Sequence, residues 1–158
     1  MSYKDLLVHV DASRHIETRL ALAVALARRF AAQLTGIYVM PPVTLSPFLA
    51  DQFPPERLQE ADAQIAQRRD VAKALFEAST AGLVPKAEWF EGEGDATELV
   101  MREARYADLA ILGQADPDER APAVSADFPE RVALGSGRPV LVIPYAGRFA
   151  TVGERVLV

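Results

Sequence analysis

Residues 6–13 read Leu6-Leu7-Val8-His9-Val10-Asp11-Ala12-Ser13, and they give the clearest indication of the fold. The run up to Val10 has the length of a strand that is buried on both faces of a parallel sheet. Asp11 ends the apolar run, and Ser13 is a residue type that favours the N-cap of a helix. Apolar residues then recur at steps of three and four, which predicts a helix with one buried face: Ile16, Leu20, Ala23, Val24, Ala27 and Phe30.

The same alternation of strand and helix continues along the chain. Short apolar runs predict four more strands, at residues 34–40, 87–91, 108–112 and 139–143. Helical patterns lie between them, at residues 55–80, 96–105 and 127–134, while 43–53 reads as an irregular loop. Five alternations predict an α/β domain with a parallel sheet and helices on both faces. Right-handed crossovers make such a sheet doubly wound.

The polar breaks after the expected strands indicate where a ligand would bind. In doubly wound sheets, ligands lie beyond the carboxyl ends of the strands, at the point where the strand order reverses. Asp11 and Ala12 follow the first strand, Met40 ends the second and Gly113 follows the fourth. We expect a ligand site among these four residues. Asp11 has a second interpretation, as a cap where the first helix begins.

Three stretches resemble the universal stress protein family. Residues 7–13 are similar to the family's opening strand, an apolar run followed by V-D-G-S, and 107–113 (Ala-Asp-Leu-Ala-Ile-Leu-Gly) to its A-D-L-I-V-M-G strand. Residues 130–132 (Glu-Arg-Val) and 138–143 (Arg-Pro-Val-Leu-Val-Ile) resemble E-R-V followed by C-P-V-L-V-V. The resemblance spans about residues 4–144. It implies an adenine-nucleotide α-hydrolase-like fold with a five-stranded sheet in the order 3-2-1-4-5.

The resemblance also implies a nucleotide motif, and this chain departs from it. Many members of the family bind ATP through G-x2-G-x9-G-[ST] after the fourth strand. Gly113 matches the first position, whereas Asp116, Ala126 and Asp127 occupy the other three. Two carboxylates would repel a triphosphate, and side chains would hinder the approach of its phosphates to the backbone amides. We therefore do not expect ATP binding by this motif. A neutral or cationic small ligand between Asp11 and Gly113 fits better.

Composition narrows the function classes. The 158 residues carry a formal charge of −5 and include no cysteine. An acidic chain without basic clusters is poorly suited to bind nucleic acid, and a chain without cysteine has no disulfides, thiolate metal sites or cysteine nucleophiles. We see no signal peptide and no apolar run long enough to span a membrane, so we expect a cytoplasmic protein without membrane or nucleic-acid partners.

Two other groups of residues could bind a metal. His9 and His15 could join Asp11, although a core and a loop histidine is the favoured interpretation. Asp116, Asp118 and Glu119 could bind Ca²⁺ or Mg²⁺, although the order of an EF-hand is absent and a solvated acidic loop is favoured. We expect no metal and no cofactor. The apolar residues of 43–53 form a lid, a partner surface or a core cover, and the sequence does not choose among these.

The resemblance favours a non-enzymatic stress or regulatory domain over an enzyme. An ATP-binding stress protein with weak ATPase activity is the alternative. Members commonly pair through the fifth strand, which implies a homodimer, or pairing with a second similar domain in the same chain. We expect the domain at residues 1–146. Residues 147–158 read as a linker and the start of a second similar domain, because 154–158 (Glu-Arg-Val-Leu-Val) look like 4–8. The alternative is a structural tail that adds an edge strand to this domain.

Overall fold

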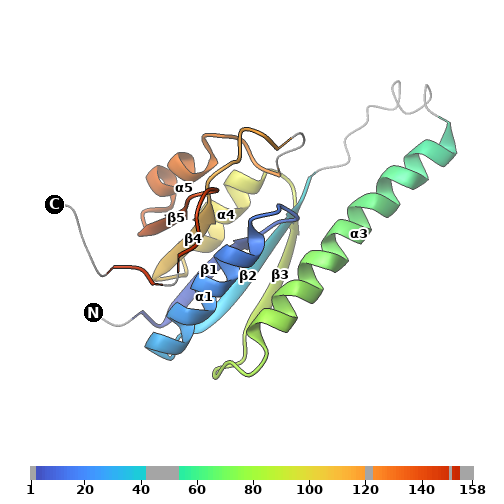
Figure 1. Ribbon diagram of the computed structural model, residues 1–158. Coiled ribbons are helices and arrows are strands. Elements are labelled where there is room, and N and C mark those ends of the chain that lie inside the picture. The colour runs from blue at the N-terminus through green and yellow to red at the C-terminus, as the bar shows by residue number, and fades with distance from the viewer. Residues whose placement is uncertain (1–2, 42–53, 120–122, 150, 154–158) are drawn as a thin grey trace.

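A parallel sheet of five strands forms the centre of the protein (Figure 1). The computed structural model describes residues 3–41, 54–119, 123–149 and 151–153. Its strands are β1 (Asp5–Val10), β2 (Gln33–Met40), β3 (Glu88–Glu93), β4 (Leu109–Gly113) and β5 (Val140–Ile143). The helices in the described ranges are α1 (Ile16–Phe30), α3 (Pro55–Thr80), α4 (Ala96–Ala104) and α5 (Phe128–Ser136).

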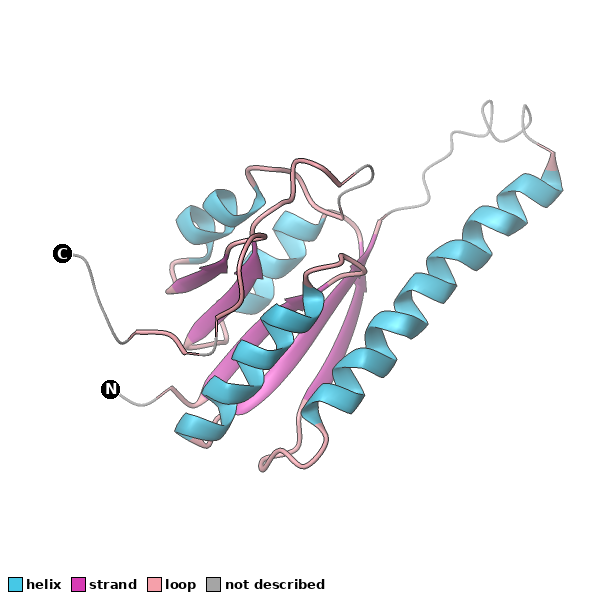
Figure 2. Ribbon diagram, viewed as in Figure 1, coloured by secondary structure: helices cyan, strands magenta, loops and turns pink. Residues whose placement is uncertain are grey.

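The strands lie in the order β3-β2-β1-β4-β5, and each neighbouring pair is parallel. This result confirms both the predicted fold class and the strand order. Helices α1 and α3 cover one face of the sheet, and α4 and α5 cover the other (Figures 1 and 2). The strand order reverses between β1 and β4, so the loops that follow these two strands meet at the switch point.

Alternate residues of β1 build two separate cores. Leu6 and Val8 pack with α1 and α3, whereas Leu7 packs with α4 and α5, and all three are almost completely buried. A strand that is covered on both faces cannot alternate apolar with polar residues, which explains the unbroken apolar run in the sequence. Burial of each such side chain stabilises the fold by roughly 1.5–3 kcal/mol.

Helix α3 packs on the sheet only near its C-terminus. Its 26 residues give a length of about 39 Å, yet Ala72, Phe76 and Thr80 are its buried residues. The preceding turns extend past the edge of the sheet (Figure 1). Phe76 packs directly on β2, where a β-carbon on Gly36 would stand 2.6 Å from the Phe76 ring. Glycine at that position therefore allows the helix to approach the strand.

Local boundaries differ from the sequence predictions in two places. Strand β3 continues through Gly92 to Glu93, because it pairs with β2 as far as Met40, so Gly92 does not close it. Ser13 is not the N-cap of α1: that position is His15, and the Ser13 amide and hydroxyl both bond to Asp11. Asp95 is the N-cap of α4, since its carboxylate accepts a hydrogen bond from the Glu98 amide.

Two predicted features lie outside the described residues. The apolar loop 43–53 is one, and the strand-like end at 154–158 is the other. Within the described residues 151–153, Val152 is partly buried against the core. Among the described helices, none combines the length and the apolar character that a membrane span requires.

Candidate functional site

The loops after β1 and β4 meet at the carboxyl end of the sheet, as the topology requires. Asp11 follows the last residue of β1, and Gly113 is the last residue of β4. Both line a narrow cleft with Arg19 of α1 and with Asp116 of the loop after β4. Two of these side chains, Asp11 and Asp116, are buried carboxylates. A buried carboxylate needs hydrogen bonds or a cation to offset its loss of hydration.

Arg19 provides the cation for Asp11. Its Nη1 donates to Asp11 Oδ2 at 3.0 Å and to the His9 carbonyl at 2.8 Å. The Arg19 side chain is only 4% exposed and that of Asp11 only 7%. Burial by itself raises the pKa of Asp11, but the positive charge of Arg19 and the hydrogen bonds from Ser13 and Arg19 outweigh it and lower the pKa to about 2. The pair is therefore ionised at neutral pH.

Gly113 leaves space for the guanidinium of Arg19. A β-carbon at this position would stand 2.6 Å from Arg19 Cζ and 2.8 Å from its Nε. The Arg19 Nε is buried and has no hydrogen-bond partner within the described part of the chain. The absence of a side chain at Gly113 thus makes room for an arginine of the same chain. The glycine that matches the first position of the family's phosphate motif contacts a cation.

His9 completes the buried cluster in a neutral form. Its Nδ1 lies 3.7 Å from Asp11 Oδ2, and its ring lies 4.9 Å from the ring of Phe128 between centroids. Burial lowers the pKa of His9 to about 4, against the pull of Asp11 and with the help of Arg19. His9 is thus a core histidine, as favoured from the sequence.

Asp116 is held by the loop after β1, which corrects the expectation that it belongs to a solvated acidic loop. Its Oδ2 accepts hydrogen bonds from Arg14 and lies 2.8 Å from His15 Nε2, while its Oδ1 accepts from the Asp118 amide at 2.9 Å. The contacts with His15, Arg14 and that amide hold the pKa of Asp116 well below its usual range. Asp118 and Glu119 are more exposed, as expected.

The cleft between these groups is almost filled. It measures about 10 Å³ among the described residues that line it, which is about the space of a single water molecule. The Tyr145 ring, which follows β5, lies against the His15 ring at 6.3 Å between centroids. In this conformation the site offers paired charges and no volume for a nucleotide. No three histidine or acidic side chains within the described ranges are grouped to hold a metal ion.

The structure separates the expected site residues into two sets. Asp11, Gly113 and Asp116 line the cleft together. Ala12 and Ala126 are exposed, and neither lines it. Met40 lies at the end of β2, where its carbonyl accepts a hydrogen bond from the Gly94 amide. Asp127 is exposed at the N-cap of α5, where its side chain makes no capping bond.

Sequence reasoning missed Arg19 and Arg14. Arg19 had a detectable signal, because it lies three residues after Ile16 and four before Ala23, on the face of the helix that was predicted to be buried. A charged residue on such a face needs a buried partner, and Asp11, at the end of the strand that precedes the helix, was a candidate for it. Arg14 had no comparable signal, since its bond to Asp116 joins residues 102 positions apart.

Comparison with protein-family models decides the family. The model of the universal stress protein family matches residues 2–144. The chain belongs to this family. A comparison with curated proteins gives no match.

Solved structures of universal stress proteins share the fold. UspA from Lactobacillus plantarum superposes with a TM-score of 0.70 at 24% identity, over 90% of this chain and 99% of that one. A universal stress protein in complex with cAMP gives a TM-score of 0.60 at 20% identity, over 92% and 100% of the two chains. The Archaeoglobus fulgidus protein in complex with dAMP gives 0.52 at 18% identity, over 90% and 98%. At these identities the likeness establishes the fold alone.

Proposed function

We propose that this universal stress protein domain is a non-enzymatic regulatory domain that does not bind ATP through the family's glycine motif. The observation that carries the proposal is the filled cleft at the carboxyl end of the sheet. Arg19 occupies the space beside Gly113, and Asp116 stands at the second glycine position of the motif with its carboxylate already paired to Arg14. A triphosphate would have to displace both groups, and it would then face a carboxylate.

The same geometry limits what the cleft accepts. With about 10 Å³ of space, a small ligand enters only if Arg14 and His15 leave Asp116. A neutral or cationic ligand would then bond to Asp11 or Asp116 without repulsion. The second candidate, nucleotide binding with weak ATPase activity, is favoured by two similar structures, which are complexes with cAMP and with dAMP. The two candidate functions predict different effects of replacing Asp116 on ATP affinity.

Calorimetric titration of Mg²⁺-ATP, AMP and cAMP into the wild type and Asp116→Gly tests the proposal. We expect no ATP binding tighter than about 100 μM in the wild type, equivalent to −5.5 kcal/mol. The variant removes the buried carboxylate and restores a motif glycine, so we expect ATP affinity to rise at least tenfold. Glu119→Gly is the control, because it removes a neighbouring carboxylate that makes no ion pair in the described structure. Wild-type binding tighter than 100 μM would favour the nucleotide candidate.

We further propose that the domain pairs through β5. This strand hydrogen-bonds to β4 on one side, and no other described strand pairs with it. Val142 is 40% exposed on β5, and Leu134 is 88% exposed on the neighbouring α5. An open strand edge beside exposed apolar side chains favours association. The partner is a second copy, or a second similar domain for which residues 147–158 would supply the linker and the start.

One longer structure supports the second form of pairing. This chain covers 48% of a universal stress protein from Pseudomonas aeruginosa, with a TM-score of 0.59 at 19% identity over 90% of this chain. The fold of this chain therefore has a counterpart inside that longer chain. Light scattering of the purified chain tests self-association. We expect a dimer that Val142→Glu dissociates, while Val71→Glu, on the exposed side of α3, leaves it intact. A monomeric wild type would overturn pairing between copies.

A further inference from the structure

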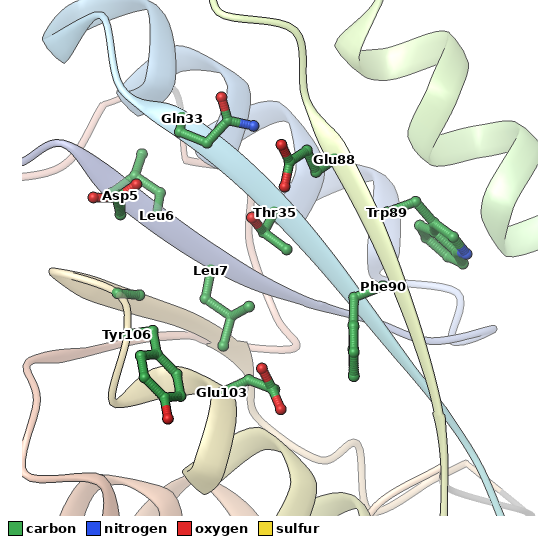
Figure 3. A pocket seen from close by; sticks show the side chains of 11 residues that line it. Asp5, Leu6, Leu7, Gln33, Thr35, Glu88, Trp89, Phe90, Glu103 and Tyr106 are labelled. Atoms are coloured by element: carbon green, nitrogen blue, oxygen red, sulfur yellow. The ribbon is translucent and has the colours of Figure 1, made fainter.

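A second hollow lies at the opposite end of the sheet from the cleft. It opens between the beginnings of β1, β2 and β3 and the last turn of α4 (Figure 3). Its volume is about 630 Å³, within the range of roughly 300–1,000 Å³ that is usual for small-molecule sites. The charged residues of the cleft, such as Asp11, Arg19 and Asp116, do not line this hollow. Whatever binds there is independent of the proposed function.

Leu7 and Phe90 give the floor of this hollow an apolar surface beside Thr35. Leu7, Thr35 and Phe90 come from three adjacent strands, and they point to the face of the sheet that α4 covers (Figure 3). Leu7 is buried, whereas Phe90 and Thr35 are only half-buried. Helix α4 has nine residues, and its buried side chains cover the floor beside Leu7 without closing over Phe90. The wall on the helix side is Tyr106, whose ring is 80% exposed.

The rim is acidic and has no matching base. Asp5, Glu88 and Glu103 line the hollow, and no lysine, arginine or histidine is among its described lining residues. The carboxylates of Asp5 and Glu88 form no ion pair within the described ranges, and Glu103 pairs by one oxygen with Arg102 at 2.9 Å. In Figure 3 the Glu103 side chain reaches toward the space between Leu7 and Phe90. The rim thus keeps a negative charge toward the hollow.

This combination selects an organic cation over a metal ion. The three carboxylates come from β1, β3 and α4, and they do not form a group that could close around a metal within the described structure. Separated carboxylates suit a ligand whose charges are also separated. Aromatic rings attract ammonium groups, carboxylates accept strong hydrogen bonds from them, and the apolar floor suits a methylene chain between them.

We propose that this hollow binds a linear diamine or polyamine, with its ammonium groups at the acidic rim and its methylene chain over Leu7 and Phe90. The site lies outside the switch-point cleft, so it can be occupied whether or not the cleft opens. Nothing in the proposal depends on a nucleotide or on pairing through β5.

Titration with a matched pair of probes tests it. The probes are 1,6-diaminohexane and 1,6-hexanediol, which have equal chain lengths and differ in their charged ends. We expect 1,6-diaminohexane to bind with a sub-millimolar dissociation constant at low salt, and to shift the amide resonances of Thr35, Phe90 and Tyr106. The diol should bind at least tenfold more weakly, and salt should weaken only the diamine. Equal binding of both probes, or no shifts at 10 mM diamine, would overturn the proposal.

Charge-matched variants separate a local site from general attraction to an acidic protein. Glu88→Gln with Glu103→Gln removes two rim carboxylates, and Glu56→Gln with Glu98→Gln removes two exposed carboxylates elsewhere. Three of the four side chains are exposed and that of Glu103 is half-buried, so circular dichroism is used to check that both double variants fold. We expect the rim pair to weaken diamine binding at least tenfold, and the control pair less than twofold. Similar losses from both pairs would show that the attraction is non-specific and would refute the site.

Discussion

The two ends of this sheet treat their carboxylates in opposite ways. At the carboxyl end, Asp11 and Asp116 are buried and paired with arginines of the same chain, and the cleft between them is nearly filled. At the amino end, Asp5 and Glu88 are exposed and without ion pairs among the described residues, beside a hollow of about 630 Å³. Acidic residues alone therefore do not reveal a ligand site. The presence or absence of an internal cation decides whether a carboxylate is available to a ligand.

Removal of Arg19 should lower the free energy of unfolding more than any other substitution at the carboxyl end of the sheet. Arg19→Met keeps most of the volume but leaves Asp11 as a buried charge without its partner, which costs about 3–5 kcal/mol. Urea denaturation measures the change in the free energy of unfolding. The control is Arg69→Met, which removes an exposed pair with Asp70 and should cost less than about 1 kcal/mol. Equal losses in the two variants would mean that the buried pair has no special weight.

Acid should lower the free energy of unfolding through protonation of His9, which lies at the carboxyl end of the sheet. Its pKa in the folded protein is about 4, below the ordinary value of 6.5, so the unfolded chain takes up the proton first. This contribution to stability is complete above about pH 6.5 and is lost as the pH falls toward 4, with a total of about 3 kcal/mol. We expect urea denaturation from pH 7 to 4 to give a steeper loss in the wild type than in His9→Gln. Parallel curves for the two proteins would contradict the assignment to His9.

A side chain at position 113 should also destabilise the protein, by a smaller amount than the loss of Arg19. Gly113→Ala places a methyl group against the Arg19 guanidinium, and overpacking of this kind costs about 1–3 kcal/mol. The double variant with Arg19→Met is the control, because the clash partner is then absent. Urea denaturation of all four proteins gives the coupling energy. Additive losses would show that Gly113 does not serve to accommodate Arg19.

A substitution at the amino end of the sheet should have the smallest effect on the free energy of unfolding. Glu88→Gln removes an exposed carboxylate that makes no ion pair in the described structure, so the free energy of unfolding should change by less than about 0.5 kcal/mol. Thermal or urea denaturation checks this value. A loss above about 1 kcal/mol would mean that Glu88 supports the fold, and the contrast between the two ends would then fail.

The fold could be predicted from the sequence because its signals are local. Each strand is a short apolar run, and the polar break at Asp11 and the glycine at 113 mark the strand ends. The expected order of the strands came from the family resemblance, and the structure confirms it. Boundaries were less exact: Ser13 was read as a cap from its residue type, yet Asp11 binds its amide and hydroxyl.

The candidate site was only partly predictable, because its decisive contacts join distant residues. The sequence identified Asp11, Gly113 and Asp116 as residues near the switch point. It did not indicate that Arg14 would cover Asp116, because Asp116 looked like one member of a hydrophilic acidic loop. The hollow at the amino end could not be anticipated either, since its lining comes from three strands and the end of α4, and no motif joins them.

Helix α3 has a consequence for how the domain unfolds. From Pro55 to Val71 its residues are exposed or half-exposed, and its first buried side chain is Ala72. Within the described part of the chain this segment buries no side chain, and a helix that is little buried is only marginally stable in water. The N-terminal turns should therefore open and close many times while the sheet stays intact, and hydrogen exchange should show amide protection that rises along the helix toward Phe76. Uniform protection would exclude this independence. If the gradient is observed, these turns form a part of the molecule whose length and sequence can change without cost to the core.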